Sequence, residues 1–332
     1  MITDTLLVSS PGQDGGLTLI DQHSQVRMIN RPITGICLND HTLLYAFQDN
    51  GGNTLKHIHN GLTKEITLTN AALDLHDVFC KEENTYLAAT ETNSVLCLNK
   101  DLKQISQWGL PGENDSAHLN STVWYQGKLL ASIFGRFQKH REYKNGTQGI
   151  GEVIDIQTGN SFIRGLSQPH SLTVVEDLLY LCSSEDQELR IYRGQELLKK
   201  IQLPGYVRGL AIGTTKIYAG LSLSRNTQTA PQADSASIAV LNRASMAIEG
   251  FVNVASREIY DIRITKSSYS LLSNLNSDLL HETRKLEELV ALYRHGYESY
   301  LCAYKVLLDE MDALSNRHRG IIAAASGTSA QE

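Results

Sequence analysis

The segment HSLTVV (170–175), LLYLCS (178–183), LRIYR (189–193) and LLKKIQL (197–203) decides the fold. It contains four apolar runs of five to seven residues, separated by short polar stretches. Runs of this length between turn residues are typical of antiparallel strands. Four such strands joined by short turns form one blade of a β-propeller.

The opening of this segment, a polar or special residue followed by an apolar strand, recurs along the chain. The copies are ITGICL (33–38), LHDVF (75–79), HLNSTVW (118–124), HSLTVV (170–175), VRGLAI (207–212) and IYDIRI (259–264). Their anchor residues, Gly35, His76, His118, His170, Arg208 and Tyr260, are separated by 41, 42, 52, 38 and 52 residues. Propeller blades repeat about every 40 to 45 residues. The two longer intervals contain polar insertions at 136–151 and 224–236.

The sixth repeat has only its first strand before the pattern changes. Three further strands are available at the other end of the chain, in TLLVSS (5–10), GLTLID (16–21) and QVRMI (25–29). Closing the ring with them would remove exposed sheet edges. We therefore predict an all-β six-bladed β-propeller over residues 1–266, with the N-terminal strands completing the last blade.

The C-terminal region has a different periodicity. From about residue 270 to 318, apolar and Tyr residues alternate at spacings of three and four, which predicts a long amphipathic, coiled-coil-like helix over 267–320. Three arrangements remain open: a hairpin folded back near Gly296, a coiled coil between chains, and docking on another protein. We expect residues 270–318 to bind a second copy or a partner protein, and the tail 321–332 to be disordered.

The composition excludes several classes of protein. Hydrophobic residues make up 41% of the chain, which suits a packed core, and a net charge of −6 argues against nucleic-acid binding. No apolar run is long enough for a membrane span. The start MITDTLLVSS lacks the basic region of a signal peptide, and the five scattered cysteines indicate reduced thiols. We therefore expect a cytoplasmic protein.

The anchors predict a polar ring at one end of the channel. The first strand of each blade lines the propeller axis, and side chains alternate along a strand. His76, His118, His170, Arg208 and Tyr260 would therefore meet at the channel mouth, with Asn120 deeper in the ring. Asp77 and Asp261 have the opposite parity, so we expect them to bond backbone amides between blades.

The two insertions are expected at the same end of the propeller, because both occupy the turn between the second and third strands of a blade. They carry the basic side chains Arg136, Lys139, His140, Arg141, Lys144 and Arg225. A funnel lined by one sign of charge concentrates ligands of the other sign. The predicted ligand is an anionic small molecule or glycan, with Asn120, Arg141, Arg225 and Glu258 as ligand-binding candidates.

Three converging imidazoles suggest a metal site. His76, His118 and His170 would suit zinc or another divalent transition metal with water as the fourth ligand. Arg208 would orient the substrate, while Tyr260 and His140 would transfer protons. The alternatives are that the histidines bind only water, or act as acids and bases without metal, and that Arg208 pairs with Glu258 or Asp261.

Two functions follow from these residues. The first is a metal-dependent lyase or hydrolase that acts on an anionic substrate. The second is a non-catalytic binding or scaffold protein that recognises a glycan or a protein partner and oligomerises through its C-terminal helix. The chain has no Walker loop, no GxGxxG motif opening a helix and no GxSxG elbow.

Six motifs resemble a bacterial family of uncharacterised proteins, labelled conserved hypothetical or domain of unknown function. They are DLHDV (74–78), PGENDSAHLN (111–120), FGRFQKHREYK (134–144), GLSQPHS (165–171), GYVRGLA (205–211) and REIYDI (257–262). The resemblance spans about residues 4 to 265, with Tyr143 where the family pattern has Trp. It implies a propeller-like fold and no particular reaction. The design is also similar to propeller lyases that use channel histidines, some with zinc. The terminal helix is not part of the family pattern.

Overall fold

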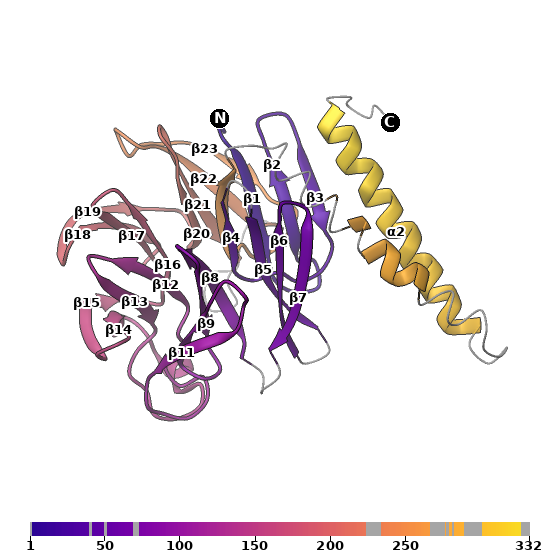
Figure 1. Cartoon of the computed structure of the whole chain (residues 1–332). Helices are drawn as coiled ribbons and strands as arrows, with labels where there is room; N and C mark the ends of the chain where they lie inside the picture. The colour runs from indigo at the N-terminus through magenta and orange to yellow at the C-terminus, as the bar shows by residue number, and fades with distance from the viewer. Residues whose placement is uncertain are drawn as a thin grey trace.

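A computed structural model describes residues 2–39, 42–49, 52–68, 73–223, 234–265, 276, 279–280, 282–288 and 301–326. Within these ranges, the strands form six antiparallel sheets of four strands each, arranged around a common axis (Figure 1). The prediction of a six-bladed propeller is confirmed.

Each blade is given from its innermost strand outward. The first blade contains β4 (Ile36–Leu38), β5 (Thr42–Asp49), β6 (Gly52–His59) and β7 (Leu62–Leu68), and the second contains β8 (Leu75–Lys81), β9 (Asn84–Ala89), β10 (Ser94–Leu98) and β11 (Gln104–Gly109). The third contains β12 (Ser121–Tyr125), β13 (Lys128–Ile133), β14 (Gly151–Asp155) and β15 (Asn160–Leu166), and the fourth contains β16 (Pro169–Val175), β17 (Leu178–Ser183), β18 (Glu188–Arg193) and β19 (Glu196–Gln202). The fifth contains β20 (Tyr206–Ile212), β21 (Lys216–Ser222), β22 (Ser237–Asn242) and β23 (Ile248–Asn253), and the last contains β24 (Asp261–Thr265), β1 (Thr5–Ser10), β2 (Gly16–Ile20) and β3 (Gln25–Ile29).

The last blade joins the two ends of the propeller sequence. β24 pairs antiparallel with β1, so that Asp261 lies opposite Ser9 and Ile262 lies opposite Val8. The N-terminal strands therefore complete the sixth blade, as the sequence predicts.

Apolar clusters between neighbouring blades form the core. Strands β9, β10 and β13 are almost entirely buried, whereas the outer strands β7, β11 and β19 alternate or expose their side chains. These buried middle strands hold the inner strands in place, which gives the axial side chains a rigid frame.

Gly35, the anchor of the first blade, contributes no side chain to the axis. A Cβ atom built there would lie 2.5 Å from the backbone nitrogen of Val78. The inner strands of the first and second blades approach so closely that only glycine fits. The polar ring is therefore drawn from the other blades.

The C-terminal region does not form one straight helix. Helix α2 spans Leu301–Ser326, and residues 282–288 form a separate helical stretch beside it (Figure 1). Leu286 and Leu314 line one cavity, although 28 residues of continuous helix would separate them by about 42 Å. The single long coiled-coil helix is therefore wrong. The alternative of a hairpin fits, but its expected turn at Gly296 lies outside the described residues.

Both helical stretches pack on the propeller. Leu279, Leu314 and Ile321 are buried in a cluster with Met28 of β3 and Tyr45 of β5. These strands belong to the last and the first blade, so the helices cover the junction between these two blades. Binding of a second copy or partner through residues 270–318 stays a prediction, and the expected disordered tail lies largely outside the described residues.

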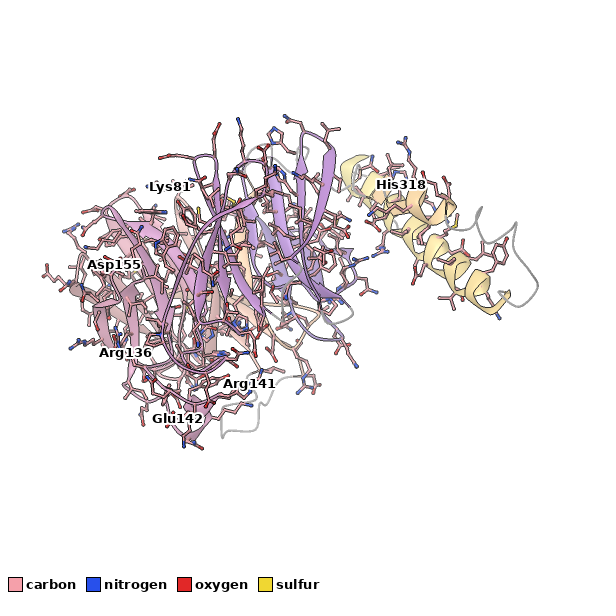
Figure 2. The ribbon with its side chains drawn as sticks, turned by 60° about the horizontal axis from the view of Figure 1, so that its bottom comes forward. Lys81, Arg136, Arg141, Glu142, Asp155 and His318 are labelled. Carbon is pink, nitrogen blue, oxygen red and sulfur yellow. A yellow bond between two sulfur atoms is a disulfide. The ribbon has the colours of Figure 1, made fainter. Side chains whose placement is uncertain are left out.

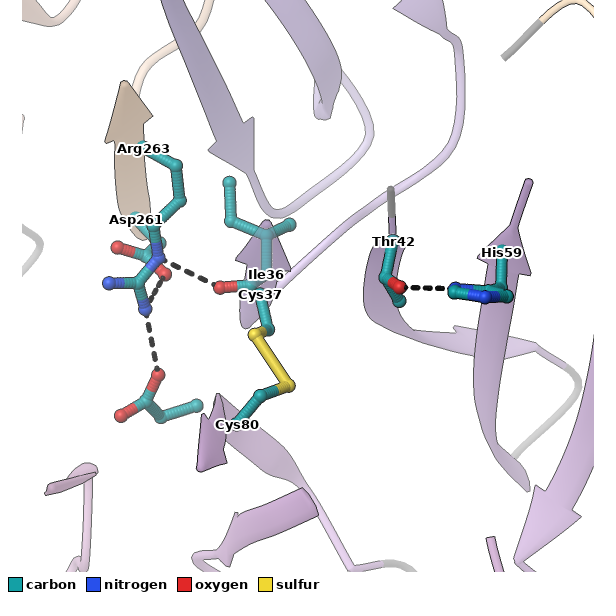
Figure 3. Close-up of a disulfide and its surroundings, with 8 residues drawn as sticks. Ile36, Cys37, Thr42, His59, Cys80, Asp261 and Arg263 are labelled. Carbon is teal, nitrogen blue, oxygen red and sulfur yellow. Dashed lines mark hydrogen bonds and ion pairs between the residues drawn. A yellow bond between two sulfur atoms is a disulfide. The ribbon is translucent and has the colours of Figure 1, made fainter. Parts of the chain in front are cut away.

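The cysteines differ from the expected set of reduced thiols. Cys37 on β4 and Cys80 on β8 form a disulfide that joins the inner strands of the first two blades, with Cα atoms 6.3 Å apart (Figure 3). Cys97 and Cys182 are free and buried. Two facing cysteines on neighbouring strands cannot be recognised from their sequence separation of 43 residues.

None of the helices in the described part of the chain is long and apolar enough to cross a membrane.

Candidate functional site

A cavity of about 720 Å³ opens at one end of the propeller axis. All five predicted ring residues line it, together with Asp74, Glu185, Glu258 and the loop residues Arg141 and Tyr143 to Thr147. The ring residues are His76, His118, His170, Arg208 and Tyr260. The volume is typical of a small-molecule site.

The rings of these residues are close neighbours. The ring centroids of His76 and His118 are 5.2 Å apart, and those of His76 and Tyr260 are 5.3 Å apart. Phe134 lies between two histidines, 4.3 Å from His118 and 5.3 Å from His170. Imidazoles that are 42 and 52 residues apart in sequence thus line one wall of the cavity.

Irregular backbone positions these side chains. His76 is the extra residue of a β-bulge in β8, and similar irregularities follow His170 in β16 and include Arg208 in β20. Residues in the left-handed region surround the cavity: Asp74, Asp115, His118, Arg141 and Gln168, with φ between 46° and 53°. Bulges and strained backbone concentrate at functional sites, where they direct side chains that regular strands cannot.

A buried carboxylate organises one side of the cavity. Asp115 is fully buried and bonds His118 Nδ1 through Oδ1 at 2.7 Å. Its Oδ2 accepts hydrogen bonds from Arg141 Nε at 2.7 Å and from the Tyr143 hydroxyl at 2.8 Å. Burial raises the pKa of Asp115, but the hydrogen bonds, that from His118 foremost, outweigh burial and lower the pKa below its ordinary value.

This arrangement fixes the tautomer of His118. Burial, followed by the charges of His76 and Arg208, lowers the pKa of His118 to about 4, although Asp115 opposes the shift. The ring is therefore neutral at neutral pH. Because an ionised carboxylate can only accept, Nδ1 carries the proton and Nε2 keeps its lone pair. His118 is thus prepared to accept a proton.

Both ring nitrogens of His76 are engaged. Its Nδ1 lies 2.9 Å from Asn120 Oδ1, and the amide orientation is fixed because Asn120 Nδ2 donates to the backbone oxygen of His118. Its Nε2 lies 3.1 Å from the carboxylate of Asp74.

These bonds decide whether three histidines can hold a metal. His170 Nδ1 faces the backbone oxygen of Gln168 and the Ser184 hydroxyl, each at 2.8 Å, so only its Nε2 remains. His76 has no nitrogen to offer. Among the described residues, no group of three His, Cys, Asp or Glu side chains converges for a metal ion. The three-histidine metal site stays a prediction that this donor set does not fit.

Arg208 lies at the floor of the cavity and is only 9% exposed. Its guanidinium stacks on Tyr260, with Cζ 3.2 Å from the ring centroid. Its Nη2 lies 3.5 Å from His76 Nδ1, but this nitrogen already donates to Asn120, so the contact joins two donors. Within the described part of the chain, no carboxylate forms an ion pair with Arg208, and the expected pairing with Glu258 or Asp261 is not observed.

A second polar layer lies beneath the ring. Arg263 Nη2 is 2.7 Å from Asp261 and 3.6 Å from Asp77, while its Nε donates to the backbone oxygen of Ile36 (Figure 3). Asp77 accepts from the backbone amide of Thr122 in the next blade, as predicted. Burial raises the pKa of both carboxyls, that of Asp261 to about 7, although Arg263 opposes it.

The side chains of this layer do not follow the predicted parity. Asp77 and Asp261 were expected to face away from the axis, yet both line a small axial cavity of about 20 Å³ with His76 and Tyr260. The bulge at His76 explains the difference for Asp77, because one extra residue shifts the alternation of side chains.

The remaining predicted residues divide into three groups. Asn120 orients His76, and Arg141 and Glu258 line the cavity. His140 does not line it: the residue is exposed, and its Nδ1 bonds the backbone oxygen of Asn114. Arg225 lies outside the described residues.

The expected basic rim is only partly present. Arg141 and Lys144 line the cavity. Arg136 lies outside it and forms an ion pair with Glu152 at 3.2 Å. Three carboxylates, Asp74, Glu185 and Glu258, also line the cavity. The site is therefore of mixed charge.

Sequence reasoning missed the acidic and aromatic partners of the ring. Asp74, Asp115, Tyr143 and Tyr206 all contact or neighbour the ring residues. Asp74 and Asp115 precede histidines by two and three residues. A search for carboxylates just before each anchor could have found them.

The fold and this cavity define a six-bladed β-propeller with a polar, ligand-sized funnel on its axis. The chain belongs to the family described as a domain of unknown function (DUF4915), whose model matches residues 34–270. The resemblance noted in the sequence is thereby confirmed. No curated protein matches the chain.

Solved structures share the fold at low sequence identity. A protein of unknown function from Bacteroides caccae is 12% identical, with a TM-score of 0.57 over 80% of this chain and 99% of that chain. A chain of a nidogen/laminin complex is 10% identical, with a TM-score of 0.55 over 78% and 97%. A putative 6-phosphogluconolactonase from Bacteroides fragilis is 12% identical, with a TM-score of 0.50 over 76% and 82%. At such identities the likeness shows the fold alone.

Proposed function

We propose that the axial cavity binds a small organic anion and that His118 exchanges a proton with it. The observation that carries this proposal is the buried guanidinium of Arg208, which forms no ion pair among the described residues. A buried guanidinium without a direct ion pair is unfavourable, and a carboxylate or phosphate from a ligand would supply that pair.

His76 lies beside Arg208 at this end of the cavity. Its Nδ1 is 3.5 Å from Arg208 Nη2, and Asn120 and Asp74 hold its ring in place. The ligand's acid group would lie at this end of the cavity.

The carboxylates at the cavity wall restrict the rest of the ligand. Asp74, Glu185 and Glu258 can only accept hydrogen bonds at neutral pH. They suit hydroxyl groups, so a hydroxylated acid such as a sugar acid fits better than a simple fatty acid. Tyr206 and Phe134 supply flat surfaces against which a ring can stack.

His118 is the group of this site best suited to move a proton. It is neutral, its Nδ1 is held by Asp115, and Nε2 retains its lone pair. A base in this state can remove a proton from carbon or oxygen near the bound acid group and return it, the proton passing between the substrate and Nε2. The proposed activity is a metal-free lyase, hydrolase or isomerase step.

A thermal-shift experiment tests binding. The protein is unfolded in the presence of gluconate, glucuronate, malate and glucose 6-phosphate, with glucose as the neutral control. A bound anion at 100 times its Kd stabilises the fold by about 2.7 kcal/mol, which raises the Tm by several degrees. We expect this shift for at least one anion, its loss in Arg208→Gln, and its retention in Arg136→Gln, which changes an arginine outside the cavity.

Deuterium incorporation separates catalysis from binding. A bound acid is incubated in D₂O, and NMR follows exchange of its carbon-bound hydrogens. We expect exchange with the unaltered protein and at least a hundredfold loss in His118→Gln, with binding kept. Binding without exchange would favour the non-catalytic alternative, and no shift with any anion would contradict the proposal as a whole.

A further inference from the structure

A second cavity, of about 370 Å³, lies at the opposite end of the propeller axis. The inner strands run away from the histidine ring, and their far ends supply Lys81 of β8, Tyr125 of β12 and Val174 of β16 to this cavity. Lys81 and Arg141 accordingly lie at opposite ends of the propeller in Figure 2. None of the residues that line the first cavity lines this one.

The two cavities are separated along the axis. Between them lies the small cavity of about 20 Å³ that contains the side chains of Asp77, Asp261 and Arg263. Space of this size admits about one water molecule. A ligand in the first cavity cannot reach the second, so the two would bind different molecules independently.

The wall of the second cavity is aromatic and aliphatic. Phe79, Trp124 and Tyr125 line it, together with Val123, Leu172 and Val174. The Lys81 ammonium lies over the indole of Trp124, with Nζ 4.5 Å from the ring centroid. Half-buried aromatic rings at the mouth of a cavity offer flat surfaces for a planar ligand.

The charged side chains of this cavity are all cationic. Among the described residues, Lys81 and Arg263 line it and no carboxylate does. Arg263 is bound to Asp261 and Asp77, whereas no ion pair or hydrogen bond of the Lys81 ammonium is found in the described ranges. The chain as a whole is acidic, so a lysine without an ion pair beside a tryptophan favours an anionic ligand in this cavity.

We propose that the second cavity binds a planar organic anion, with its ring against Trp124 and its acid group on Lys81. The volume accommodates one or two rings. The Lys81 ammonium would move partly off the indole to contact the acid group. The ligand ring would then take the position of the ammonium on the aromatic wall. This site goes beyond the proposed function and does not depend on it.

Tryptophan fluorescence provides the test, because the chain has only two tryptophans, Trp108 and Trp124. Trp108→Phe leaves Trp124 as the single reporter. The probe is benzoate, and benzamide is the uncharged control of the same shape. We expect saturable quenching by benzoate, at least fivefold weaker binding of benzamide, and at least fivefold weaker binding of benzoate in Lys81→Gln.

Two further variants make the result specific. Lys103→Gln, an exposed lysine in another part of the second blade, should leave benzoate binding unchanged. Arg208→Gln should also leave it unchanged, since Arg208 lies in the first cavity. Equal binding of benzamide, no effect of Lys81→Gln, or no saturable quenching would overturn the proposal. Loss in Arg208→Gln would place benzoate in the first cavity and overturn it as well.

Discussion

His118 Nδ1 lies 2.7 Å from Oδ1 of Asp115, a carboxylate with no exposed surface. Asp115 holds three partners at once, since Arg141 and Tyr143 donate to its other oxygen. His118 lies just before the inner strand of the third blade, β12. Arg141 and Tyr143 lie in the insertion that follows Phe134 in the same blade. One carboxylate therefore orients the proposed base and attaches the insertion to the cavity.

Replacing Asp115 by Asn should destabilise the protein. The exchange removes the charge that three donors share in a buried environment, and breaking such a group typically costs about 3 kcal/mol. Urea unfolding measures the change. Glu152→Gln, which breaks the exposed pair with Arg136, is the matched control and should cost less than about 1 kcal/mol. Equal losses in the two variants would show that Asp115 has no organising role.

The contribution of His118 to the stability of the protein should fall as the pH decreases from 6.5 to 4, whereas Asp261, whose pKa burial raises to about 7, contributes in the opposite direction over this range. Burial lowers the pKa of His118 from its ordinary 6.5 to about 4, so its contribution is complete above 6.5. Below that value the unfolded chain takes up the proton first, and stability is lost until the folded protein is protonated near pH 4, in total about 3 kcal/mol. His170, whose pKa burial and Arg208 also lower, acts in the same direction.

Urea unfolding at several pH values measures this loss. His118→Gln should lower the slope of the unfolding free energy against pH between pH 6.5 and 4 by up to about 1.4 kcal/mol per pH unit, the value for one proton. An unchanged slope in His118→Gln would mean that His118 titrates alike in the folded and unfolded chain.

Arg208→Met should leave the ligand-free protein as stable as before or stabilise it by about 1 to 3 kcal/mol. The reason is that a buried cation without a carboxylate partner is unfavourable, and an apolar side chain of similar length packs against Tyr260 equally well. Thermal and urea unfolding without ligand measure the effect. Arg190→Met, at a buried arginine that pairs with Asp186 and Glu188, should be strongly destabilised instead. Strong destabilisation of both would show that Arg208 is structural.

The blade count and ring closure could be predicted because both depend on spacing. Repeated anchors at propeller intervals, and three unpaired strands at the N-terminus, allow few other arrangements. The convergence of His76, His118 and His170 follows from the same symmetry. The family's motifs coincide with these anchors, because the cavity is built from the starts of the inner strands.

The finer features depend on local irregularities that the pattern does not reveal. The bulge at His76 changes the side-chain parity at Asp77, and one extra residue leaves no mark in the alternation of apolar residues. The role of Asp115 requires left-handed backbone at positions 115 and 118, which neither Asp nor His specifies. The docking of Leu314 on the propeller was missed because a helical stripe does not indicate which surface covers it.

Gly35→Ala should disrupt the first blade. The new Cβ would lie 2.5 Å from the Val78 nitrogen, which is backbone and cannot move aside without separating the inner strands. We expect a loss of about 3 kcal/mol or more, or failure to fold. Gly250→Ala, in the outer strand β23 with open space around it, should be nearly neutral. Soluble yield and the thermal midpoint distinguish the two variants. A stable Gly35→Ala protein would show that the inner strands can separate at little cost in free energy.

Glu282→Gln should loosen the C-terminal helices from the propeller. Glu282 lies 2.6 Å from the ammonium of Lys56, whose side chain is only 2% exposed on β6. Removing this carboxylate takes a close partner from the buried Lys56 ammonium, which also lies 3.8 Å from Glu65, so we expect a loss of about 2 to 3 kcal/mol. Hydrogen exchange should rise in α2 and in β3, which the helices cover, and not in β16. Glu287→Gln, an exposed change on the same helical stretch, is the control. Unaltered exchange in Glu282→Gln would indicate that the apolar contacts of Leu314 and Ile321 hold the helices without this ion pair.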